Sequence, residues 1–204
     1  MTPRPSNAWT TTRLMRRTAS VVTSLVATAV LPTPAGAAPA PTHAPMAAPR
    51  AAALACRAAT PTGRPVTFSP KLTLRPRHVN ITGTLKLTAC TSPDGSHQRL
   101  RSATLTMKGS GQASCSGASN ITGTATITWH DAAGRPAGTS AIASTRRSIS
   151  GYNPGDALLG GTVTRGVLTG RRVIGSATPT SDVTSCATGG LATLHAAGTI
   201  RFVR

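Results

Sequence analysis

The sequence contains no glutamate, and aspartate is its only acidic residue. Four acidic side chains stand against 22 lysines and arginines, which gives a formal net charge of +18 at pH 7. Paired catalytic carboxylates and calcium or magnesium sites both need clustered acidic side chains. The aspartates are instead dispersed among glycine, proline and serine residues: Asp94, Asp131, Asp156 and Asp182. We therefore interpret them as turn residues that bind their own backbone.

Aromatic residues and helical patterns are also scarce. Beyond residue 54 the aromatic residues are Phe68, Trp129, Tyr152 and Phe202. Proteins that bind single-stranded nucleic acids or sugars stack them on aromatic rings, and this chain has few rings to offer. Apolar residues recur with a period of two rather than 3.6, and glycine, threonine and serine interrupt every stretch that might form a helix. The sequence therefore argues against a helical protein.

Recognisable catalytic and metal-binding motifs are missing as well. The chain has no GxSxG nucleophile elbow, and none of its cysteines has the spacing of zinc ligands. Its glycine pairs precede strand-like stretches rather than the helix that a phosphate-binding loop requires. We predict a protein that is not an enzyme and has no cofactor. A hydrolase with a convergent site remains an alternative, for which His130-Asp131 and His195 are the residues to follow.

Residues 1–37 have the features of an export signal. An apolar run from Ala19 to Leu31 is followed by prolines and by Ala35-Gly36-Ala37, which fits the small-x-small rule for cleavage. Four arginines precede the run: Arg4, Arg13, Arg16 and Arg17. Their removal lowers the net charge from +18 to +14. The run is too short for a spanning helix, so we expect a secreted, extracellular protein with no membrane span in its mature form.

The remaining chain divides into a linker and one domain. Residues 38–54 are rich in alanine and proline, and such a segment buries too little apolar surface to offset the entropy of ordering it. We predict a disordered linker there. Residues 55–204 have the length of a single domain with a core of its own.

A repeated stretch indicates the fold of this domain. Asn80-Ile-Thr-Gly-Thr is followed forty residues later by Asn120-Ile-Thr-Gly-Thr, and both copies alternate apolar and polar residues. This alternation predicts half-buried β-strands, and similar stretches separated by turns continue to residue 202. We predict an all-β fold, an antiparallel β-sandwich or barrel of about 8–10 short strands. The two copies would be next-but-one strands of one meander or counterparts in facing sheets.

All four cysteines lie within this domain: Cys56, Cys90, Cys115 and Cys186. An even number of cysteines in an exported chain predicts two disulfides. Three connectivities are possible. We favour Cys56–Cys90 and Cys115–Cys186, because each would join an irregular segment to a strand end.

Basic residues cluster beside the predicted strands. We consider eight arginines as a possible anion-binding set: Arg75, Arg77, Arg99, Arg101, Arg146, Arg147, Arg171 and Arg172. Several of them brought to one rim would attract an anionic cell-wall polymer or another polyanion in a salt-sensitive, electrostatic manner. An alternative is that the excess of arginine and alanine reflects a GC-rich genome.

Several short motifs resemble those of small proteins secreted by actinobacteria, mainly streptomycetes. They are Thr67-Phe-Ser-Pro70 near the first cysteine, Ala113-Ser-Cys115, and Ile127-Thr-Trp129. The resemblance spans roughly residues 56–202 and implies a secreted β-protein with two disulfides, in a group that has no assigned activity. We therefore expect a non-enzymatic extracellular or cell-envelope protein. An inhibitor or small-ligand carrier is an alternative, marked by a protruding loop or a deep apolar cleft.

Overall fold

A computed structural model describes residues 51–150 and 160–204, with the side chains of 145–150 excepted. The predicted signal peptide, nearly all of the predicted linker, Tyr152 and Asp156 lie outside the described residues. β1 begins at Leu54, and Ala53 and Leu54 are both fully buried, which places the start of the packed chain two residues ahead of the predicted boundary. None of the helices in the described ranges is long and apolar enough to cross a membrane.

The described residues form an all-β fold, as predicted, with ten strands and one helical turn. The elements are β1 (Leu54–Ala59), β2 (Val66–Leu72), β3 (Arg77–Thr91), β4 (Ser102–Ser114), β5 (Gly117–His130), β6 (Pro136–Ser150), β7 (Gly161–Gly166), β8 (Arg172–Pro179), α1 (Ser185–Thr188), β9 (Leu191–Leu194) and β10 (Ala196–Val203).

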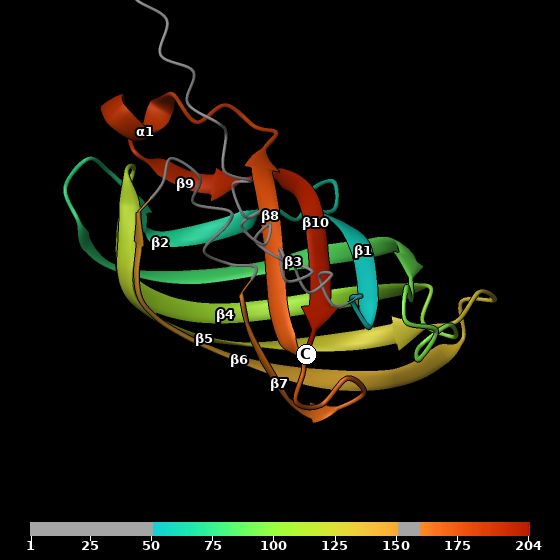
Figure 1. The fold of residues 1–204 in the computed structure, drawn as a ribbon. Helices are drawn as coiled ribbons and strands as arrows, with labels where there is room; N and C mark the ends of the chain where they lie inside the picture. The colour runs from blue at the N-terminus through green and yellow to red at the C-terminus, as the bar shows by residue number, and fades with distance from the viewer. Residues whose placement is uncertain (1–50, 151–159) are drawn as a thin grey trace, which may run out of the picture. The chain divides into compact units, whose positions relative to one another are not determined.

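Eight of the strands close into an antiparallel barrel in the order β3-β4-β5-β6-β7-β8-β10-β1. Pairing of β1 with β3 completes the ring, with Ala59 opposite Lys86. The first half of β3 pairs instead with β2, where Ile81 lies opposite Phe68, and β9 extends that side of the sheet. Figure 1 shows the long strands β3 to β6 side by side, with β8, β10 and β1 crossing in front of them. Of the two predicted architectures, the barrel is the one observed.

The repeated stretch forms β3 and β5, which both pair with β4. The copies are therefore next-but-one strands of a meander, the first of the two predicted arrangements. Their apolar residues point into the barrel: Val79, Ile81, Leu85 and Leu87 of β3 and Ile121, Ile127 and Trp129 of β5 are all buried. The hydrophobic effect thus fixes the register, because a slip by one residue would turn each apolar set towards solvent.

Two groups of buried side chains fill the interior. The larger group, the main core, includes Trp129, Phe202, Leu54, Leu87 and Leu105. Trp129 and Phe202 are fully buried and meet edge to face, with ring centroids 5.5 Å apart. The smaller group, the second core, lies under β2, β9 and α1 and includes Phe68, Leu72, Val79, Leu191 and Leu194.

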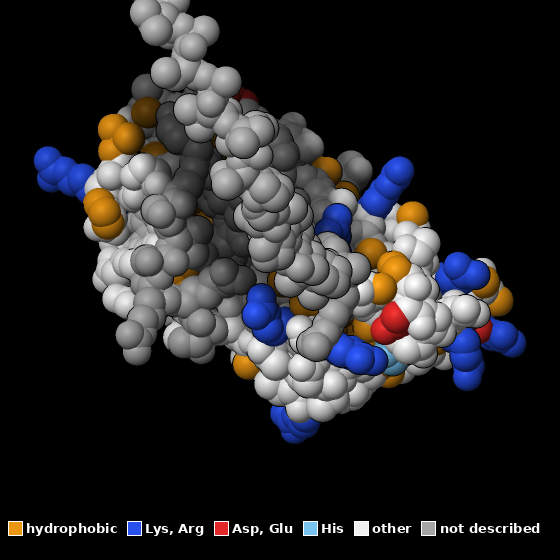
Figure 2. Space-filling view, in the orientation of Figure 1, with side chains coloured by type: hydrophobic (Ala, Val, Ile, Leu, Met, Phe, Trp, Pro, Cys, Tyr) orange, Lys and Arg blue, Asp and Glu red, His pale blue; other side chains and the backbone are white. Residues whose placement is uncertain are grey.

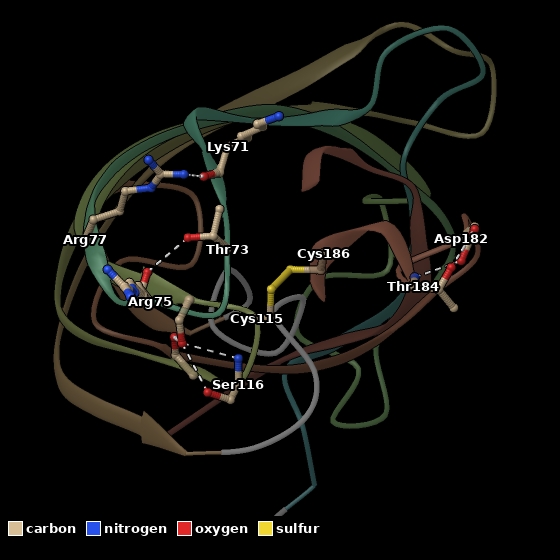
Figure 3. Close-up of a disulfide and its surroundings, with 11 residues drawn as sticks. Lys71, Thr73, Arg75, Arg77, Cys115, Ser116, Asp182, Thr184 and Cys186 are labelled. Carbon is tan, nitrogen blue, oxygen red and sulfur yellow. Dashed lines mark hydrogen bonds between the residues drawn. A yellow bond between two sulfur atoms is a disulfide. The ribbon is translucent and has the colours of Figure 1, made fainter. Parts of the chain in front are cut away.

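Two disulfides have the favoured pairing. Cys56–Cys90 joins β1 to β3, two strands that are already hydrogen bonded. Cys115–Cys186 joins the turn after β4 to α1, and Figure 3 shows it beside the chain that follows β2. Cys115 also donates its backbone N–H to the carbonyl oxygen of Thr73 (2.9 Å). The second disulfide therefore attaches the α1 segment to the barrel.

Local details go beyond the alternating pattern. β4 runs without a break through Gly109 and Gly111, and a bulge or irregularity in its pairing with β5 lies between Ser110 and Gln112. β2 ends at Leu72, and Leu74 beyond it is 62% exposed. The helical turn α1 was not predicted, because four residues are too few to show a period.

Candidate anion-binding rim

Two loops fold over one end of the barrel, where β3 ends and β4 begins. Leu100 of the first loop and Leu168 of the second are buried in the main core. Arg99 and Arg101 flank Leu100 and are both exposed. Burial of the leucine therefore turns the two guanidinium groups towards solvent. Figure 2 shows Lys and Arg side chains gathered on the side of the molecule where, in Figure 1, the arrows of β3 and β5 end.

The hairpin between β5 and β6 brings a third arginine to this end. Arg99, Arg101 and Arg135 line one depression of about 350 Å³, together with Gln98, Asp131, Ala132 and Ala133. The backbone N–H of Arg101 donates to the carbonyl oxygen of His130 (2.9 Å), which holds the first loop against the hairpin. We call Arg99, Arg101 and Arg135, with Arg171 of the second loop, the basic rim.

The one carboxylate in this depression is already bound by its own turn. Asp131 accepts hydrogen bonds from the backbone N–H groups of Ala133 (2.9 Å) and Arg135 (3.0 Å). Its other oxygen receives two N–H groups of the Arg135 guanidinium, each at 2.9 Å. These contacts, chiefly the backbone N–H of Arg135, lower the pKa of Asp131. The depression therefore keeps an excess of positive charge at neutral pH.

The other described aspartates are turn residues as well. Hydrogen bonds from Ser96 lower the pKa of Asp94, with smaller contributions from Ser92 and from the charge of Arg171. That last contribution places Arg171 within electrostatic reach of the first loop. Hydrogen bonds from the backbone and side chain of Thr184 lower the pKa of Asp182. The interpretation of the aspartates as turn residues holds for these three.

These shifts predict a loss of stability in acid. A carboxyl group whose pKa is lower in the folded protein stabilises it above the ordinary value of 3.8, and this contribution disappears as the pH falls through the folded value. Above about pH 5 the three aspartates should therefore leave the melting temperature independent of pH. Below about pH 4 their protonation should lower the melting temperature. In melting curves, Asp131→Asn should weaken the acid-induced decrease. An unchanged decrease in this variant would contradict the assignment.

The eight predicted arginines do not form one patch. Arg99, Arg101 and Arg171 belong to the basic rim, whereas Arg75 and Arg77 lie at the opposite end of β3, roughly 45 Å away along the strand. There Arg77 donates to the carbonyl oxygen of Lys71 (2.7 Å; Figure 3). Arg172 begins β8 and lines a different depression. The side chains of Arg146 and Arg147 lie outside the described residues.

Arg135 was missing from the predicted set, although it belongs to the depression. It lies in the hairpin loop between β5 and β6. What the sequence does not show is the register, in which Ser102 lies opposite His130 and so brings the first loop beside this hairpin. The two loops form one site only because β4 pairs with β5 in this register.

Of the two histidines named for the hydrolase alternative, His195 has a side-chain contact that supports the fold, and His130 contributes a backbone contact. His195 Nδ1 lies 3.0 Å from Thr60 Oγ1, and its backbone N–H donates to Ser181 Oγ. The neighbouring Asp182 is bound to Thr184. The carbonyl oxygen of His130 accepts the N–H of Arg101. Within residues 51–150 and 160–204 no three His, Cys, Asp or Glu side chains are grouped so that they could hold a metal ion.

No protein-family model, curated protein or solved structure matches this chain. Inference of function therefore rests on the chemistry of the rim and of the barrel interior.

Proposed function

We propose that this is a secreted, non-enzymatic protein of the extracellular space or cell envelope that binds an anionic polymer through the basic rim. The observation that carries the proposal is the convergence of Arg99, Arg101 and Arg135 on one depression. The single carboxylate there is neutralised by Arg135. The two disulfides are consistent with an oxidising compartment outside the cell.

Guanidinium groups suit such a partner. Each offers a planar fork of N–H donors that matches the oxygens of a phosphate, sulfate or carboxylate group, and it stays charged at all physiological pH values. A polymer that repeats such groups would occupy the depression and reach Arg171 across the loops. With no aromatic residue among those that line the depression, recognition would depend on charge rather than on base or sugar identity.

Removal of two rim charges should weaken this binding strongly. Each contact with a phosphate of duplex DNA adds about −0.9 to the slope of log K against log salt concentration. Relative to 1 M salt, one such contact therefore raises the affinity roughly tenfold at 50 mM salt. Arg99→Gln with Arg101→Gln should therefore reduce the slope by about two and the affinity on the order of 100-fold at low salt. Binding to duplex DNA, heparin and wall teichoic polymer would be measured across a salt series.

A matched control is Lys86→Gln with Lys108→Gln, which removes the same charge from exposed positions on β3 and β4. If binding followed net charge alone, both double variants would lose affinity equally, and the rim would have no special part. No binding of the unsubstituted protein to any of the three polymers at low salt would also end the proposal.

A further inference from the structure

The barrel interior holds a cavity that is separate from the basic rim. Three small residues form a row across the inner face of neighbouring strands: Gly109 of β4 lies opposite Gly123 of β5, and Gly123 lies opposite Ser144 of β6. Glycine contributes no side chain to the interior at these positions. The row lies along a cavity of about 50 Å³.

The cavity lies between the two cores and has apolar walls. Ile81 of the second core lines it, as do Leu105, Ile142, Val173 and Ile200 of the main core. Met107 and Ala125 complete the wall, and Met107 packs against both cores. Methionine is flexible and adapts to irregular spaces, so this wall can yield to a ligand.

The two copies of the repeat differ in what surrounds their glycine. A Cβ atom on Gly83, in the first copy, would lie 3.0 Å from Val66 Cγ2 and 3.1 Å from Met107 Cε, so neighbouring side chains already fill the space there. At Gly123, in the second copy, the three nearest atoms to an added Cβ all belong to the backbone of β4. No side chain is among these nearest atoms at Gly123, whereas side chains of Val66 and Met107 cover the equivalent Gly83.

The cavity adjoins a depression on the side of the barrel. Ser144 and Val173 line both the cavity and a depression of about 540 Å³ between β6, β7 and β8. β7 is short, and the two residues that pair it with β8, Gly161 and Thr162, line this depression. Ser144 and Val173 therefore lie between the depression and the cavity, and a molecule that reached from one into the other would pass them.

Two polar groups lie along this route. Ser144 Oγ is buried and has no hydrogen-bond partner among the described residues, a state that native proteins seldom leave unexplained. Arg172 lines the depression and is exposed. No described carboxylate pairs with it, since Asp94, Asp131 and Asp182 are bound to their own turns. The route thus leads from a cation, past a free hydroxyl, into an apolar cavity.

We propose that this route binds a small amphiphile with a straight alkyl chain and a single anionic head group. The head group contacts Arg172 and accepts a hydrogen bond from Ser144, and the chain end enters the cavity. Small antiparallel barrels have interiors suited to one small ligand, and apolar walls with a few placed polar groups are typical of such sites. The narrow cavity favours a straight chain over a branched one.

The test is equilibrium binding of octanoate to the protein by calorimetry. Ala125→Leu fills the cavity and should reduce the affinity at least tenfold. Thr126→Leu places the same side chain at the next, exposed position of β5 and should leave the affinity unchanged. Arg172→Gln should weaken octanoate about tenfold without changing the affinity for octanol, which has no charge. A branched acid with eight carbons should bind more weakly than octanoate.

Ser144→Val is a second filling variant, used if Ala125→Leu fails to fold by circular dichroism. Equal octanoate affinities in the unsubstituted protein and a folded filling variant would overturn the proposal, as would no binding of octanoate at millimolar concentration. The rim variant Arg99→Gln with Arg101→Gln should retain octanoate binding. Failure of this site and failure of polymer binding at the rim are therefore distinguishable.

Discussion

Replacing Cys115 and Cys186 with alanine should lower the free energy of unfolding by about 4 kcal/mol. The disulfide spans 71 residues of sequence, and closing a loop of that length restricts the unfolded chain strongly. It also attaches α1 to the end of β4, and the second core lies beneath that segment. We therefore expect denaturant-induced unfolding at a lower midpoint and faster hydrogen exchange in β9 than in the barrel strands.

The companion variant lacks Cys56 and Cys90 instead. That disulfide spans 34 residues, so the loop-closure contribution is again about 4 kcal/mol. It joins strands that are themselves hydrogen bonded within the barrel, so its loss should speed exchange throughout the barrel rather than in β9 alone. The same exchange pattern in both variants would contradict the view that the Cys115–Cys186 disulfide secures a separate end of the fold.

Replacing Trp129 with alanine should cost about 3–5 kcal/mol, the usual range for a large aromatic residue in a core. Trp129 is fully buried against Phe202. Its Nε1–H donates to Ser140 Oγ (2.8 Å), and that hydroxyl donates to the carbonyl oxygen of Val167. The side chain thus connects β5, β6 and the loop after β7. Urea unfolding followed by circular dichroism measures the loss.

Two milder variants separate packing from hydrogen bonding. Trp129→Phe keeps an aromatic ring but has no N–H group, and Ser140→Ala removes the acceptor while keeping the indole. Ser140→Ala should cost about 1–3 kcal/mol, because it leaves the buried Trp129 N–H without a partner. A loss below about 1 kcal/mol for Trp129→Ala would show that this residue does not anchor the core.

The strands were predictable because their burial alternates. One face of β3 and of β5 is apolar in the sequence, and the same face is buried in the barrel. Closure of the ring was not predictable, since the β1–β3 pairing joins residues far apart in sequence. The short β7 spans Gly161–Gly166. Its sequence does not reveal how few of its residues pair with β8.

The candidate sites depend on the same long-range pairing. Arg99 and Arg101 stood out in the sequence, but only the register of β4 and β5 brings Arg135 beside them. The cavity did leave a trace in the sequence: Gly109 and Gly123 occupy positions where the alternation demands an inward residue. No pattern within a single strand shows that Gly109 lies opposite Gly123, or that Gly123 lies opposite Ser144.

The most direct test of the basic rim is to map it with the arginine side chains themselves. Nε–Hε resonances of the ¹⁵N-labelled protein would be followed while a short duplex DNA or heparin fragment is added at low salt. We predict that Arg99, Arg101 and Arg135 shift first and most, and that the shifts disappear as salt rises. Equal shifts of all exposed arginines, or larger shifts at Arg75 and Arg77, would contradict a binding site at the rim.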